Sequence, residues 1–291
     1  MIIVPPPLAV TGSTGSLGGR VAAGLSAAGV KQRLLARIPR KAPPVDGATV
    51  LQAAYENTSA TRTALAGAET VFMVSASESL ERLEQHCDFV DAALEAGVRH
   101  LVYVSFVGAA QDAVFTLARD HFATEEYIRA SGLDFTFLRD NLYADFLPGL
   151  VGADGAIRGP AGAGRVAVVA QHDIARTAVA ILRDPAPHAG ATYELTGPEA
   201  LSLDEVARAL GQARGEPVSY IDESVEEAFA SRAPYGAPKW QVEAWVSTYL
   251  AIAAGAMERV SGDIEAITGV PPMTLAQLLE TLPPPASGHG G

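Results

Sequence analysis

The chain has 291 residues, of which 48% are apolar and 19% are charged, so its composition is that of a globular protein with one large core or two smaller ones. The formal net charge of −12 argues against nucleic acid or an anionic membrane as the main partner. Cys87 is the single cysteine, which excludes an internal disulfide and a thiolate zinc site, and the histidine spacing predicts no metal site.

Three glycines with the spacing Gly-x-x-Gly-x-x-Gly follow the first predicted strand. Residues 8–10 form an apolar run, Gly12, Gly15 and Gly18 predict a tight turn, and residues 20–28 predict an amphipathic helix. Bare N–H groups and the positive end of the helix dipole favour a pyrophosphate in such a turn. Gly12 would permit the sharp turn, Gly15 the approach of the phosphates, and Gly18 the packing of helix on strand. A glycine-rich turn without a ligand is the alternative.

A basic position follows the second predicted strand, residues 31–36. Arg37 lies about 20 residues beyond the glycines, where dinucleotide-binding folds contact the adenosine ribose, and Arg40 and Lys41 come next. A carboxylate there would repel a 2′-phosphate, whereas a guanidinium binds one with two hydrogen bonds. The sequence therefore predicts NADP(H) as the preferred cofactor, with NAD(H) also possible.

Strand and helix patterns alternate through the first half of the chain. Further strands are predicted at 49–51, 70–74, 100–105 and 135–138, and helices at 59–66, 83–96 and 122–130. Gly97 and Gly132 stand where two of these helices would end. The alternation predicts an α/β fold with a doubly wound, parallel, Rossmann-like sheet. We place this NADP(H)-binding domain at residues 1–150, with returning elements in 166–196.

The second half changes character after residues 149–164, a stretch rich in glycine and proline that predicts a long loop. The returning elements are a strand at 166–169, a helix at 173–182 and a strand at 192–195. Residues 197–282 carry helical patterns at 203–213, 225–231, 241–253 and 275–282. We expect them to form a mainly helical substrate cap over the carboxyl ends of the strands, where open α/β sheets bind ligands.

The two ends of the chain carry little patterning. Residues 283–291 predict a disordered tail. Residues 1–7 lack the charged start of a signal peptide, and no apolar run is long enough to span a bilayer. We therefore expect a cytoplasmic protein without a membrane partner.

Several segments together resemble the NmrA-like branch of the atypical short-chain dehydrogenases/reductases, and within it the bacterial NAD(P)H:quinone oxidoreductases and triphenylmethane reductase-type proteins. The resemblance covers roughly residues 8–282, and its marks are residues 11–18, 74–78, 85–86, 96–105, 121–125 and 138–143. The glycine motif alone would indicate only the superfamily. The segments His-Phe-Ala-Thr-Glu at 121–125 and Arg-Asp-Asn-Leu-Tyr at 139–143 narrow it to this branch.

The resemblance implies a set of site residues at the ends of successive strands. Near residues 170–173, where the family often has an arginine, this chain reads Ala-Gln-His-Asp, which bears on affinity more than on the fold. The implied cofactor contacts are Gly12, Ser13, Thr14, Gly15, Ser16, Leu17, Gly18 and Arg37, then Ser75, Ala76 and Ser77 beside the nicotinamide ribose, Ser105, Phe106 and Val107 beside the nicotinamide, and Asn141 in the pocket lining.

The Tyr-x-x-x-Lys pair of ordinary short-chain dehydrogenases is absent from the helix after the fifth strand. The chain's lysines are Lys31, Lys41 and Lys239, and the literal match from Tyr235 to Lys239 contains a glycine and a proline that would break the required helix. Without a proton donor whose pKa is adjusted to the reaction, catalysis loses a factor on the order of 10²–10⁴ in rate. A quinone tolerates that loss, because hydride addition to it gives a stabilised aromatic phenolate.

His121 and Tyr143 are the candidate catalytic residues. His121 would contact the nicotinamide end as a hydrogen-bond donor or proton source, and its alternative role is a local bond to Glu125, one helical turn away. Tyr143 would donate to the acceptor's oxygen or form the pocket wall, and its alternative is a buried aromatic residue. We expect His86 to fasten its helix structurally.

The prediction that combines these features is an NADPH-dependent reductase that transfers hydride to a quinone or a similar conjugated acceptor. Trp245 and Tyr249, spaced i, i+4, would wall a pocket for a small aromatic substrate or simply belong to the core. The alternative is a non-catalytic NADP(H)-sensing regulator. A tailoring reductase for one aromatic metabolite is not separated from the first function, and the sequence leaves the oligomeric state open.

Overall fold

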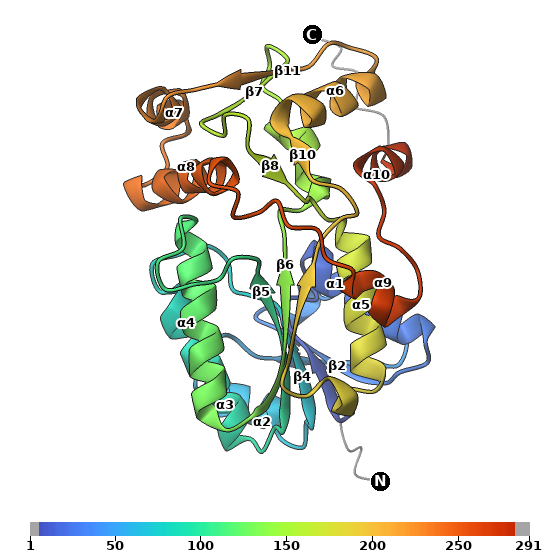
Figure 1. Ribbon diagram of the computed structural model, residues 1–291. Coiled ribbons are helices and arrows are strands. Elements are labelled where there is room, and N and C mark those ends of the chain that lie inside the picture. Colours follow the sequence, from blue (N-terminus) through green and yellow to red (C-terminus); the bar gives the residue numbers. More distant parts are fainter. Residues whose placement is uncertain (1–5, 283–291) are drawn as a thin grey trace.

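The computed structural model describes residues 6–282, so the tail predicted at 283–291 lies outside the described residues. Its centre is a parallel seven-stranded sheet with the order β3-β2-β1-β4-β5-β6-β9 (Figure 1). Its strands are β1 Leu8–Val10, β2 Gln32–Ala36, β3 Ala48–Gln52, β4 Thr70–Met73, β5 His100–Phe106, β6 Asp134–Asp140 and β9 Ala191–Leu195. This order is that of doubly wound dinucleotide-binding sheets, as predicted.

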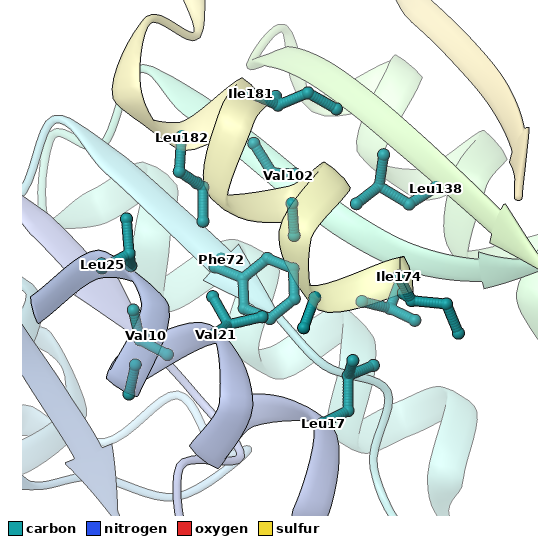
Figure 2. Close-up of a cluster of buried hydrophobic side chains, with 14 of the residues drawn as sticks. Val10, Leu17, Val21, Leu25, Phe72, Val102, Leu138, Ile174, Ile181 and Leu182 are labelled. Carbon is teal, nitrogen blue, oxygen red and sulfur yellow. The ribbon is translucent and has the colours of Figure 1, made fainter. Parts of the chain in front are cut away.

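One face of the sheet is covered by α1 (Ser16–Ala27), α5 (Gln171–Arg183) and the short α9 (Asp263–Thr268) (Figure 1). Alternate strand residues point to this face, because successive side chains of a strand lie on opposite sides. Figure 2 shows how they meet the apolar sides of α1 and α5 in one core cluster. The strand side chains of this cluster include Val10, Phe72, Val102 and Leu138, and the helix side chains include Val21, Leu25, Ile174 and Ile181.

The opposite face is covered by α2 (Ser59–Leu65), α3 (Arg82–Glu95) and α4 (Thr116–Ser131). Here the neighbouring strand residues Ala9, Val71, Tyr103 and Phe137 form a second core cluster. The central strands β1, β2, β4, β5 and β6 are thus largely buried on both faces, as in a parallel sheet between helices, whereas the edge strand β3 is partly exposed. Both helical layers leave the carboxyl ends of the strands pointing toward the upper part of the molecule (Figure 1).

That upper part is the predicted cap, and its helices are α6 (Leu203–Arg214), α7 (Val225–Arg232), α8 (Lys239–Ala253) and α10 (Leu275–Thr281). Two small sheets accompany them. β7 (Ala156–Gly159) pairs in parallel with β11 (Ser219–Asp222), and β8 (Arg165–Val166) pairs antiparallel with β10 (Leu201–Ser202). The predictions of a loop throughout 149–164 and of a strand over 166–169 are therefore wrong in detail. Strand β7 is held by a partner about 60 residues away in sequence, which local patterning does not reveal.

Smaller elements complete the described chain. The helix of the glycine turn begins at Ser16, four residues before the predicted start, and α9 was not predicted. Short 3₁₀ helices occur at Pro39–Lys41, Ala144–Leu150, Ala186–His188 and Ala233–Tyr235. Within residues 6–282, none of the helices has the length and apolarity to cross a membrane, and no group of three or more acidic, histidine or cysteine side chains is arranged to hold a metal ion.

Candidate functional site

A cleft of about 480 Å³ opens at the carboxyl ends of β1, β2 and β4. The glycine turn forms one side through Gly12, Thr14 and Gly15, and Arg37 contributes from the end of β2. The segment of Ser75, Ala76 and Ser77, which follows β4, also lines the cleft. Sequence segments far apart in the chain therefore meet at one edge of the sheet, as expected for parallel strands.

The glycine turn has the backbone geometry that a phosphate site needs. Gly12 has φ +63°, which strains any residue with a side chain, and a Cβ on Gly18 would lie 2.4 Å from the backbone of Gly12. Gly15 lines the cleft and is the N-cap of α1, so the N–H groups of the first helical turn begin at the cleft without a side-chain cap. The buried hydroxyl of Ser13 has no hydrogen-bond partner within residues 6–282. These features fit a dinucleotide pyrophosphate.

The other residues predicted to contact the coenzyme near the glycine turn do not all line the cleft. Arg37 is exposed and lines the cleft, as does Glu56, which was not a predicted site residue. Ser16 and Leu17 lie in the first turn of α1, and Leu17 packs into the core beneath it. Arg40, by contrast, lies in the exposed 3₁₀ helix Pro39–Lys41.

A second cavity, of about 760 Å³, lies between the end of β5 and the cap. Its walls are rich in aromatic rings, and both Trp245 and Tyr249 line it, as predicted for a pocket rather than a closed core. The ring of Tyr249 lies so close to Gly159 that a Cβ there would be 2.2 Å from it. The aromatic lining residues are Phe106, Phe115, Phe146, Tyr235, Trp245 and Tyr249.

The two guanidinium groups of this aromatic cavity are already paired with carboxylates of the protein. Arg158 forms two hydrogen bonds with Asp154, and Arg232 contacts Glu223 at 3.0 Å. The guanidinium of Arg232 also lies 5.1 Å from the ring centroid of Tyr249. The cavity therefore presents mainly apolar and aromatic surface, which suits a flat uncharged ring system.

His121, the first catalytic candidate, lies on α4 with 6% of its surface exposed. Its Nε2 accepts a hydrogen bond from Arg82 Nη2 at 2.8 Å, and its Nδ1 lies 2.9 Å from the Tyr103 hydroxyl. Burial, and then the charge of Arg82, lower the pKa of His121 well below its ordinary value, so the ring is neutral at pH 7. A neutral imidazole is a poor proton source, and both ring nitrogens already have partners in Arg82 and Tyr103. The contact of His121 with the nicotinamide end stays a prediction.

The alternative role of His121, a local bond to Glu125, is wrong. The Glu125 carboxylate is fully buried and accepts from Ser105 Oγ at 2.6 Å and from Arg139 at 2.6 and 2.8 Å. Ser105, predicted beside the nicotinamide, therefore directs its hydroxyl toward α4. Of its two neighbours, Phe106 lines the aromatic cavity and Val107 is buried in the core below it.

Tyr143, the second catalytic candidate, donates to Asp140 Oδ2 at 2.6 Å. Burial, and then Asp140, raise the pKa of Tyr143 well above its ordinary value, and burial likewise raises the pKa of Asp140. The Tyr143 ring lies 5.3 Å from that of Phe146, which lines the aromatic cavity. Asn141 is buried and donates to the carbonyl of Met257 at 2.9 Å, which ties the end of β6 to the chain after α8.

Sheet order, glycine turn and basic position together define a dinucleotide-binding α/β protein of the Rossmann type. The chain belongs to the NmrA-like family, which matches residues 7–269. The resemblance and the fold class predicted from the sequence are both confirmed.

Individual relatives match nearly the whole chain. Quinone oxidoreductase 2 of Escherichia coli is 31% identical over 94% of this chain and 98% of its own length, and an NAD(P)H azoreductase of Xenophilus azovorans is 30% identical over 92% and 95%. The solved structure of the E. coli enzyme with NADPH has a TM-score of 0.86 at 30% identity and covers 94% of this chain and 98% of that one. Triphenylmethane reductase of Citrobacter with NADP(H) gives 0.82 at 31% identity, with the same coverage.

Proposed function

We propose that the chain is an NADPH-dependent oxidoreductase that transfers hydride to a quinone or a similar conjugated aromatic acceptor. One observation carries the proposal: a cleft suited to a dinucleotide and an aromatic cavity share a single wall segment. Ser75, Ala76 and Ser77 line the cleft, and the next residue, Glu78, lines the cavity. The relatives named as quinone oxidoreductase, azoreductase and triphenylmethane reductase support the same class of reaction.

The residues of the cleft would hold the coenzyme by their backbone as much as by their side chains. The N–H groups of the first turn of α1, which begins after Gly15, would bind the pyrophosphate, and Arg37 would bind the 2′-phosphate, so that NADP(H) is preferred and NAD(H) remains possible. Bound NADPH supplies the hydride from its nicotinamide ring. Phe106 and the cap aromatics would stack the acceptor and exclude water, so that rate arises mainly from positioning.

The choice of acceptor follows from the proton donors near the cavity. Tyr235 and Lys239 do not share a helix, since Gly236 has φ +63° and Pro238 precedes α8. The buried imidazole of His121 is neutral, and Tyr143 already donates to Asp140. An acceptor whose reduced form is a stabilised anion, protonated afterwards by water, suits this set of groups.

We also propose that different segments of the chain bind the coenzyme and the acceptor. Residues 1–150 with 166–196 would bind the coenzyme, and residues 197–282 would supply about half of the lining of the acceptor cavity. The role of residues 197–282 is supported by the cavity-lining residues that lie between Leu203 and Ile252. Segment 151–165 would act with the cap, because β7 and β8 pair with cap strands.

The test is a coenzyme titration followed by an acceptor panel. NADPH and NADH are titrated into the purified protein by fluorescence, and NADPH oxidation is then followed with simple quinones, azo dyes and triphenylmethane dyes. We expect tighter binding of NADPH than of NADH and turnover with at least the quinones. Tight NADPH binding with no turnover on the whole panel would contradict the reductase and support an NADP(H)-sensing regulator.

A further inference from the structure

Both backbone polar groups of Ala76 are held by side chains of one helix. The N–H of Ala76 donates to His86 Nε2 at 2.8 Å, and its carbonyl accepts from Arg82 Nε at 3.0 Å. Ala76 follows β4 in a stretch without regular secondary structure, and it lines the dinucleotide cleft. Two α3 side chains thus take the place of a strand partner at this point of the chain.

These two side chains are themselves buried and braced from α4. His86 Nδ1 lies 2.9 Å from Thr124 Oγ1, whose own proton goes to the Asp120 carbonyl at 2.7 Å. His86 must therefore carry its proton on Nδ1, which leaves Nε2 free to accept from Ala76. Burial, and then Arg82, lower the pKa of His86 to about 3, so the neutral form persists at physiological pH.

The side chain of Arg82 is also buried and held by hydrogen bonds, like that of His86. Only 4% of its surface is exposed, its Nη2 donates to His121 Nε2 at 2.8 Å, and its Nη1 lies 3.4 Å from the Asp120 carboxylate. Neither Arg82 nor His86 is among the residues that line the cleft or the aromatic cavity. Ala76 is the cleft-lining residue to which both side chains form hydrogen bonds, and the ring of His86 also lies 6.1 Å from that of Tyr55, another residue of the cleft lining.

The segment that they hold separates the two cavities. Its first three residues face the cleft, whereas Glu78 lines the aromatic cavity and accepts a hydrogen bond from Gln241 of α8 at 3.2 Å. A shift of Ala76 would therefore move the surface against which the coenzyme rests relative to the acceptor cavity. Displacements near 1 Å at such a site cost about 10²-fold in rate.

We propose that Arg82 and His86 are positioning residues, which set the nicotinamide end of the coenzyme against the acceptor by fixing the backbone N–H and carbonyl of Ala76. This inference depends on the proposed function, because it assumes that the cleft binds NADPH. It assigns to His86 a role beyond fastening its own helix. Arg82, which was not a predicted site residue, acts with it.

The first test compares His86→Leu, which removes the acceptor for the Ala76 N–H, with His86→Gln, whose side-chain amide can both accept and donate. NADPH dissociation constants are measured without acceptor, and single-turnover NADPH oxidation is then measured at saturating coenzyme with a simple quinone. We expect His86→Leu to lower the saturated rate by about 10-fold or more and to weaken NADPH binding. His86→Gln should recover most of both losses.

A matched control is His100→Leu. His100 is also a buried histidine with one side-chain hydrogen bond, to Thr136 at 2.8 Å, but it begins β5 at the end of the sheet opposite the cleft. We expect this variant to lower the melting temperature while its folded fraction keeps the wild-type binding and rate. Arg82→Met and Arg82→Lys form a second pair, with the loss expected in the first and partial recovery in the second.

The outcomes separate this inference from the proposed function. Failure of the wild type to bind NADPH would overturn the proposed function and the inference together. If the wild type binds NADPH but His86→Leu and Arg82→Met behave like His100→Leu, the inference alone is overturned. Hydrogen exchange covers the case in which the disruptive variants do not fold: the Ala76 amide should exchange slowly both in the wild type and in His86→Gln, and fast exchange in the wild type would overturn the inference.

Discussion

Arg37 is the residue on which the choice between the two coenzymes depends. It is exposed at the end of β2, lines the cleft and has no side-chain partner within residues 6–282 that a 2′-phosphate would have to displace. Hydrogen bonds to charged groups contribute about 1.5–3 kcal/mol, which corresponds to roughly 10–100-fold in affinity. We expect Arg37→Ala to raise the dissociation constant of NADPH by that factor and to leave that of NADH nearly unchanged.

Fluorescence titration of both coenzymes measures this effect directly. Arg40→Ala is the control, because Arg40 lies three residues further on in an exposed 3₁₀ helix and is not among the cleft-lining residues. Equal weakening of NADPH and NADH by Arg37→Ala would show that Arg37 does not recognise the 2′-phosphate.

The residue scale also sets the limit of prediction from sequence. The glycine turn could be predicted, because a positive φ at Gly12 and the close approach at Gly18 leave glycine as the only unstrained residue. The partners of Ser105 and His121 could not, because their hydrogen bonds join β5, α3 and α4, and no sequence spacing encodes which polar groups meet in a buried layer. The role of Arg82 could not be predicted from the sequence for the same reason.

At the scale of elements, local signals and distant pairing account for what was predicted and what was missed. Helices α6, α7 and α10 begin with complete capping boxes, at Ser202 with Glu205, Ser224 with Glu227 and Thr274 with Gln277, so their starts are encoded within four residues. The missed strands β7 and β11 have four residues each and are stabilised by each other across the cap. Their signal is in the tertiary contact rather than in the local sequence.

The capping box of α6 provides a prediction at this scale. Ser202 accepts from the N–H of Glu205, and the Glu205 carboxylate accepts from the N–H of Ser202 at 2.8 Å. We expect Ser202→Ala to lower the free energy of unfolding by about 1 kcal/mol, measured by urea denaturation. Ser59→Ala, at the exposed first position of α2, should have a smaller effect, and equal losses in the two variants would argue against a cap at Ser202.

For the molecule as a whole, burial of neutral histidines between α3, α4 and the sheet makes stability depend on pH. His86 has a pKa of about 3 in the folded protein, and the pKa of His121 is also lowered, in both cases chiefly by burial. When the pH falls below about 6.5, these histidines bind protons in the unfolded chain but not in the folded protein, so the folded state loses stability. Asp140 acts with the opposite sign, because its raised pKa lets the folded protein keep a proton that the unfolded chain releases.

Because these contributions overlap, variants rather than the wild-type curve isolate the histidines. A proton that binds the unfolded chain but not the folded protein changes the free energy of unfolding by about 1.4 kcal/mol per pH unit. Between pH 6.5 and 5, His86 should therefore account for about 2 kcal/mol of the lost stability. We expect urea denaturation of His86→Gln to give a correspondingly shallower decline over this range, with His172→Gln, at an exposed position, as the control for loss of an imidazole. Parallel declines in the wild type and both variants would mean that His86 takes up its proton in the folded protein. The acceptor for the Ala76 N–H would then be lost within the working pH range, and the positioning role inferred for His86 would be lost with it.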